Sequence, residues 1–77
     1  EKSPVDNLSD RELEVYRMIG HGFGTNEIAQ KLHLSVKTIG CYRERIKEKL
    51  GLKSGTELMR NAMRWVEDDS ILMEPGS

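Results

Sequence analysis

A chain of 77 residues with an apolar share of 36% can hold one small domain, and its low aromatic share of 5% favours helices over a β-sandwich. A single cysteine excludes an internal disulfide and indicates a reducing, cytoplasmic environment, and no apolar run approaches the roughly 18 residues of a membrane span. The net charge of −1 conceals a basic segment, because residues 35–53 carry +4 and the remainder carries −5. A basic stripe of this kind is typical of a nucleic-acid-binding surface, although a solvated helix face has the same pattern.

The first predicted helix covers residues 9–20. Ser9 and Glu12 have the spacing of a capping box at its start, and apolar residues follow at helical intervals. Gly22 is expected to end the helix in the left-handed conformation. The preceding residues 1–7 are polar and without periodicity, so we expect a linker. Because the chain starts with a residue other than Met, we expect a fragment of a longer protein.

A short second helix is predicted over residues 25–32. Thr25 is expected to be its N-cap, and Glu27 lies favourably in the positive first turn. We expect the Glu27 carboxylate to pair with an arginine inside the domain, either Arg43 or Arg45.

A longer third helix is predicted over residues 36–50. Ser35 is its expected N-cap, and Gly51 is expected to stop it. Its spacing predicts an inward face made of Val36, Ile39, either Tyr42 or Arg43, Ile46 and Leu50.

The fourth predicted helix covers residues 55–66. A second capping box, from Ser54 to Glu57, opens it. Residues 67–77 are expected to form a flexible tail. Four helices joined by short loops predict an all-α four-helix bundle over residues 8–66.

The segment from Thr25 to Leu50 has the pattern of a helix-turn-helix. A short helix, a tight turn and a longer basic helix follow one another. In this motif the second helix enters the major groove and presents its N-terminal turns to base edges, while its capped end offers free amides to a phosphate. The sequence therefore predicts sequence-specific binding of double-stranded DNA for transcription regulation.

A series of short motifs runs through the chain in a fixed order. They are Leu8-Ser9, Arg11-Glu12, Val15, Gly22, Asn26-Glu27-Ile28-Ala29, Leu32, Leu34-Ser35, Lys37-Thr38-Ile39, Ile46, Lys49-Leu50-Gly51 and Thr56-Glu57-Leu58. With these motifs the chain resembles the LuxR/NarL/FixJ family of helix-turn-helix domains, also called the GerE type, over residues 8–66. The resemblance implies a bacterial, cytoplasmic DNA-binding domain that forms a homodimer through its last helix. It also implies an upstream regulatory domain, either the phosphoacceptor receiver of a two-component response regulator or a ligand-sensing domain, with RNA polymerase as a further candidate partner.

The chain departs from the family pattern at two positions of the third helix. Tyr42 stands where a histidine is common, and it can still donate a hydrogen bond to a phosphate. Gly40 stands where a long residue facing the bases is common. Glycine in a helix costs about 1 kcal/mol relative to alanine, so Gly40 either lets the backbone approach DNA closely or has no role.

Four residues of the third helix are predicted to contact base edges: Lys37, Gly40, Cys41 and Glu44. Lysine can donate to guanine acceptors, and glutamate can accept from a cytosine amine. The alternative is that these side chains form an ordinary solvent-facing surface. A redox role for Cys41 is less favoured than a place in the groove.

A second set of residues is predicted to contact DNA phosphates, which supplies affinity and register without reading sequence. Arg45 or Lys47 could instead pair with Glu48 or with an acid of the first helix. The predicted phosphate contacts are Thr25, Asn26, Ser35, Thr38, Tyr42, Arg43, Arg45 and Lys47.

The fourth helix has a wider apolar surface than one core contact needs, which favours a second partner. The alternative is that Ile71 and Leu72 of the tail fold back and cover this surface. The predicted dimer interface consists of Met59, Ala62, Met63, Trp65 and Val66.

Other functions have weaker support in the sequence. A helical domain that docks on an acidic protein partner, and a promoter-contacting domain like that of a sigma factor, are the alternatives. No nucleophile–base pair or glycine-rich phosphate loop indicates an enzyme. His21, His33 and Cys41 lack the spacing of zinc ligands, so we expect no metal and no cofactor.

Overall fold

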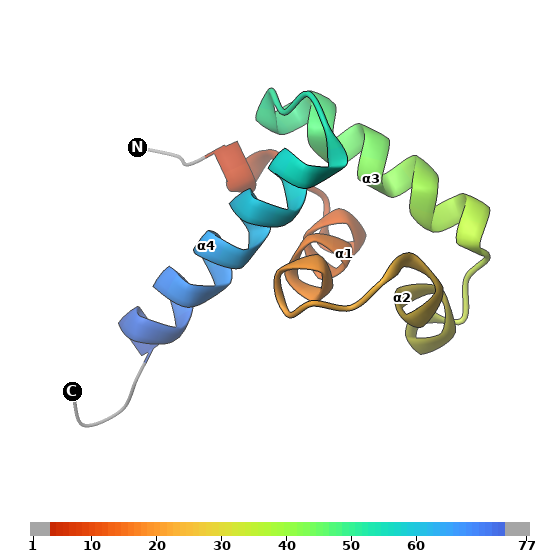
Figure 1. Cartoon of the computed structure of the whole chain (residues 1–77), viewed down its shortest axis with the longest axis horizontal. Helices are drawn as coiled ribbons and strands as arrows, with labels where there is room; N and C mark the ends of the chain where they lie inside the picture. Colours follow the sequence, from red (N-terminus) through yellow and green to blue (C-terminus); the bar gives the residue numbers. More distant parts are fainter. Residues whose placement is uncertain (1–3, 74–77) are drawn as a thin grey trace.

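The computed structural model describes residues 4–73, and the side chains of residues 5–68. Helices account for all the regular secondary structure of this part of the chain, which confirms the all-α fold expected from the sequence (Figure 1). In chain order the elements are a 3-10 helix η1 (Pro4–Asn7) and the α-helices α1 (Asp10–Gly20), α2 (Thr25–Leu32), α3 (Val36–Leu50) and α4 (Gly55–Met73).

Helix α1 is the central element of the bundle. It packs against both α3 and α4, while α2 packs chiefly against α3 (Figure 1). Every α-helix contributes apolar side chains to a single core, as its spacing predicts. The buried apolar side chains are Leu8, Val15, Tyr16, Ile19, Ile28, Ala29, Ile39, Ile46, Leu58 and Ala62.

Local hydrogen bonds set the ends of the helices. At the start of α1, Ser9 Oγ accepts from the Glu12 amide at 3.2 Å, and Glu12 Oε1 accepts from the Ser9 amide at 2.9 Å, so the first capping box is confirmed. Gly22 follows α1 with φ +93°, in the left-handed conformation that was predicted for it, and Gly51 ends α3, as predicted, with φ +70°. At the start of α4, Ser54 Oγ caps the Glu57 amide, but the Glu57 carboxylate accepts from the Lys53 amide, one residue before the predicted position.

The start of α2 differs from its prediction. The N-cap is Gly24, so Thr25 is the first helical residue and not the cap. Glycine has no side chain that can accept from the first-turn amides, so only the reverse contact of a capping box is made, in which Glu27 Oε1 accepts from the Gly24 amide at 3.0 Å. The expected pairing of Glu27 with Arg43 or Arg45 is wrong, since its carboxylate serves the backbone of its own helix start.

The inward face predicted for α3 is correct at Ile39 and Ile46 and wrong at Val36. The Val36 side chain is 49% exposed. It lies about 60° around the helix from Ile39. It also belongs to the first turn, where α3 extends beyond α1 (Figure 1). Core packing therefore begins at Ile39.

Both ends of the described chain are more helical than expected. Residues 4–7 form η1, with Val5 packed against the core and its carbonyl accepting from the Leu8 amide. Helix α4 continues past its expected end at Val66 to Met73, because no glycine or proline interrupts it there. The alternative in which Ile71 and Leu72 fold back over the fourth helix is therefore wrong for the backbone, which continues as helix to Met73. The side chains of those two residues, and residues 74–77 of the expected tail, lie outside the described part.

Candidate nucleic-acid interface

The N-terminal end of α3 is capped and open to solvent. Ser35 Oγ accepts from the Thr38 amide at 3.1 Å and lies 2.8 Å from the Thr38 hydroxyl oxygen. Ser35 and the following residues Val36 and Lys37 are exposed. The remaining amides of this first turn have no partner within the helix, so they are available to an acceptor from outside.

The two sides of α3 differ sharply. Ile39 and Ile46 are 0% exposed and attach the helix to the core. The opposite side presents Lys37, Cys41 and Glu44, all of them exposed. Beside them Gly40 is half-buried, and a Cβ placed on it would have no atom within 4 Å. The structure thus brings the four predicted base-contact residues to one open face.

The α3 residues predicted to contact phosphates lie on the flanks of the helix. They differ from one another in exposure and in the partners of their side chains. Arg45 is exposed, whereas Thr38 and Tyr42 are half-buried, and Tyr42 packs against the core. Lys47 Nζ pairs with Glu44 Oε2 at 2.8 Å, across one turn, and not with Glu48 or an acid of α1. Arg43 is half-buried, and its guanidinium lies beside Gly55 at the start of α4. A Cβ added to Gly55 would lie 3.2 Å from it.

Helix α2 lies beside α3 and contributes two further predicted residues. Asn26 is exposed, and Thr25 is half-buried at the first position of the helix. Both belong to the first turn of α2, where unpaired amides again point out of the helix end.

An ion pair that the sequence reasoning missed holds the far end of α3. Lys49 Nζ donates to Glu12 Oε1 at 2.7 Å and to the Asn7 carbonyl at 3.3 Å. Glu12 is only 3% exposed. Burial raises the pKa of Glu12, but the hydrogen bonds from Lys49 and Ser9 outweigh burial, so the pKa lies below its usual value. The carboxylate therefore stays charged, and Lys49 ties α3 to α1 through Glu12 and to η1 through the Asn7 carbonyl.

No sequence signal distinguished this pair from the other charges. The capping box already accounted for Glu12, and Lys49 was one of several basic residues in the basic segment. The two residues are 37 positions apart, so their contact depends on how α1 and α3 cross.

The surface predicted for dimerisation on α4 divides into an exposed part and a buried part. Met59 and Met63 are 46% and 47% exposed. Ala62 is fully buried against α1, so it is not available to a second molecule in this conformation. Val66 is half-buried, and a Cβ added to Gly20 would lie only 2.5 Å from the Val66 Cγ2 atom. The exposed apolar strip is therefore narrower than predicted.

Trp65 is also engaged within the domain. The centroid of its ring lies 5.5 Å from that of the Tyr16 ring, and the Arg17 guanidinium carbon lies over the Trp65 ring, 5.8 Å from its centroid. Burial raises the pKa of Tyr16 to about 12, so its neutral hydroxyl donates to Asn61 Oδ1. Trp65 and Tyr16 thus help to hold α4 on α1.

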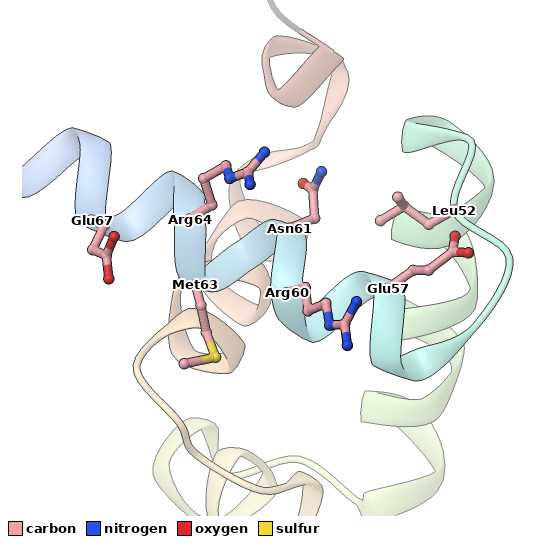
Figure 2. A pocket seen from close by; sticks show the side chains of 7 residues that line it. All are labelled: Leu52, Glu57, Arg60, Asn61, Met63, Arg64 and Glu67. Atoms are coloured by element: carbon pink, nitrogen blue, oxygen red, sulfur yellow. The ribbon is translucent and has the colours of Figure 1, made fainter.

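An open hollow of about 600 Å³ runs along the outer side of α4. Figure 2 shows the side chains that line it, most of them charged or polar and projecting from successive turns of α4. Its lining residues are Leu52, Glu57, Arg60, Asn61, Met63, Arg64 and Glu67. Acidic and basic side chains are equal in number on this side of α4, whereas basic ones outnumber acidic ones on α3.

The matched family agrees with this geometry. Residues 6–62 match the family described as bacterial regulatory proteins, luxR family. The chain belongs to the luxR family. Its α2–α3 unit is accordingly the helix-turn-helix of a DNA-binding transcription regulator, in a family described as regulatory proteins.

Curated relatives of this luxR-family domain include the oxygen regulatory protein NreC of Staphylococcus aureus strains JH9 and JH1. Each is 48% identical over 61 residues, which cover 79% of this chain and 28% of the relative. The chain thus spans less than a third of the length of these relatives. No solved structure gave a significant match.

Two kinds of feature are absent from the described residues. They contain no group of three or more histidine, cysteine or acidic side chains arranged to hold a metal ion. Within the same residues no helix is both long and apolar enough to cross a membrane.

Proposed function

We propose that this luxR-family domain reads DNA by placing the N-terminal half of α3 in the major groove. The observation that carries the proposal is the open face of α3, where Lys37, Cys41 and Glu44 are exposed directly opposite the buried core residues. Lys37 donates to guanine acceptors, and Glu44 accepts from a cytosine amine. Gly40 and Cys41 add little bulk, which permits a close approach between the helix and the base edges.

The flanks of α3 and the start of α2 hold the phosphates on either side of the groove. Arg45 is the most accessible cation of this set, whereas Lys47 shares its charge with Glu44 and Arg43 lies against α4. The uncharged backbone amides at the start of α3 add a further binding site for a phosphate. The proposed phosphate contacts are Thr25, Asn26, Ser35, Thr38, Tyr42, Arg43, Arg45 and Lys47.

Two variants of α3 separate sequence reading from phosphate binding. Lys37→Ala is expected to lose about 1–3 kcal/mol at one base-pair position and to relax the preference there. Arg45→Ala is expected to weaken binding to all duplexes alike and to lower the salt dependence by about one counterion. The measurement is selection of bound duplexes from a random pool, followed by titrations of each protein at several salt concentrations.

The same titrations test the competing protein-docking role. DNA binding by counterion release requires affinity to fall steeply with salt. If duplex binding were absent, or if Lys37→Ala left the selected sequence unchanged, the proposed position of the reading face would be wrong.

We further propose that the domain binds as a two-fold dimer through α4. Met59 and Met63 lie four residues apart and form one exposed apolar strip, which supports a second contact for this helix. Val66 lies next to this strip around the helix, whereas Trp65 points away from it and packs against Tyr16. A two-fold dimer would place two recognition helices about one helical turn apart, on an inverted-repeat operator.

Met63→Glu is expected to reduce cooperative binding to a full operator while it leaves binding to a half-site unchanged. The new charge would be buried between two apolar strips in the dimer but solvated in the monomer. Titration of full-site and half-site duplexes by fluorescence anisotropy measures the two affinities. Equal loss on both duplexes would show that Met63 acts within the domain, and the dimer proposal would then fail.

The remaining partners lie outside this chain. Because the chain spans 28% of its NreC relatives, we propose that a regulatory domain, a receiver in a two-component system, adjoins it in the full protein. The setting would be the bacterial cytoplasm, where bound operators are accessible to RNA polymerase.

A further inference from the structure

An apolar side chain is exposed at the end of α3 that is proposed to enter the groove. Among the side chains that the structure describes, three large apolar ones are strongly exposed: Val36, Met59 and Met63. The two methionines share the strip on α4. Val36 is alone on α3, where it is the first helical residue after the Ser35 cap.

The neighbours of Val36 leave it accessible. Val36, Gly40 and Glu44 follow at four-residue spacing and form one ridge along α3. The middle of this ridge is bare, because Gly40 has no side chain and a Cβ there would meet nothing within 4 Å. Side chains on a helix lean toward its N-terminus, so Val36 leans toward the end that enters the groove first.

The chemistry of the major groove offers one apolar feature for such a side chain. Each thymine presents a C5-methyl group there, whereas the other base edges present hydrogen-bond donors and acceptors. Valine ends in two methyl groups and has no polar atom. We propose that Val36 contacts a thymine methyl group, with the bare backbone at Gly40 permitting the close approach, and so sets a preference for a T·A pair at one position of each half-site.

This inference rests on the proposed placement of α3 in the major groove, and it assigns a reading role to a residue that sequence spacing placed in the core. Lys37 and Glu44 read polar groups of neighbouring pairs. Val36 reads an apolar group, which polar side chains cannot distinguish.

The test removes single methyl groups from the DNA. Each thymine of a selected half-site duplex is replaced in turn by deoxyuridine, and affinities are measured by fluorescence anisotropy. For the unsubstituted protein we expect about fourfold weaker binding at one position, the effect of one buried methyl-sized group. Val36→Ala should bind the thymine and uracil duplexes equally at that position and keep the original pattern elsewhere. Because Val36 is exposed and alanine favours helices, this variant should fold normally.

Thr56→Ala is the matched control, since it truncates an exposed β-branched side chain of similar size in the first turn of α4, away from the proposed reading face. It should keep the fourfold dependence on that methyl group. The proposal is overturned if Val36→Ala retains the original methyl dependence, if it weakens all duplexes uniformly, or if Thr56→Ala abolishes the dependence instead. Absence of any salt-dependent duplex binding by the unsubstituted protein would overturn the proposed function itself, which is a distinguishable result.

Discussion

Gly20→Ala is expected to destabilise the domain by about 2 kcal/mol, despite the higher helix propensity of alanine. A Cβ on Gly20 would lie 2.5 Å from the Ala62 carbonyl oxygen and 2.5 Å from Val66 Cγ2. The first of these atoms belongs to the backbone of α4, so the conflict cannot be relieved by turning a side chain. Helix α4 would have to move away from α1, and the contacts of Leu58 and Ala62 with the core would loosen.

Gly40→Ala is the matched control for Gly20→Ala. A Cβ on Gly40 meets no atom within 4 Å, so only the propensity effect remains, and we expect a gain of about 1 kcal/mol. Urea denaturation followed by circular dichroism gives both free energies of unfolding. Changes of the same sign in the two variants would mean that close packing at Gly20 does not govern the position of α4.

Lys49→Met is expected to cost about 2 kcal/mol at neutral pH. It would leave the Glu12 carboxylate buried with the Ser9 amide as its remaining hydrogen-bond donor. The expected cost is below that of a fully buried pair, because the Lys49 side chain is 39% exposed and water can partly replace it.

The cost of Lys49→Met should depend on pH. The pKa of Glu12 is lowered in the folded domain, so the pair contributes fully above the unfolded pKa of about 4.3, and its contribution is lost as pH falls through the folded pKa. The difference in stability between the two proteins should therefore shrink as pH falls below about 4. Urea denaturation from pH 7 to pH 3 measures it.

Lys53→Met supplies the comparison, since it makes the same substitution at an exposed lysine of the following turn. Its effect should be small and nearly independent of pH over the same range. A pH-independent cost for Lys49→Met would indicate lost packing of the lysine stem and not a lost ion pair.

The sequence by itself determined the features that depend on contacts within a few residues. The capping box of Ser9 and Glu12, the Ser35 cap of α3 and the left-handed stop at Gly51 connect groups no more than four residues apart. Such contacts are determined by the local residue types whatever surrounds them. Order and spacing of these local signals were also sufficient to indicate the helix-turn-helix and the polar face of α3.

Only the tertiary structure decided the features that depend on how the helices cross. Lys49 reaches Glu12 because the end of α3 lies over the start of α1, and Ala62 is buried because Gly20 lets α4 approach α1 closely. Val36 is exposed because the first turn of α3 extends past the core, although its spacing matches the apolar face. Helical periodicity gives the direction of a side chain around its own axis. Whether another element lies in that direction is determined by the packing of the whole bundle.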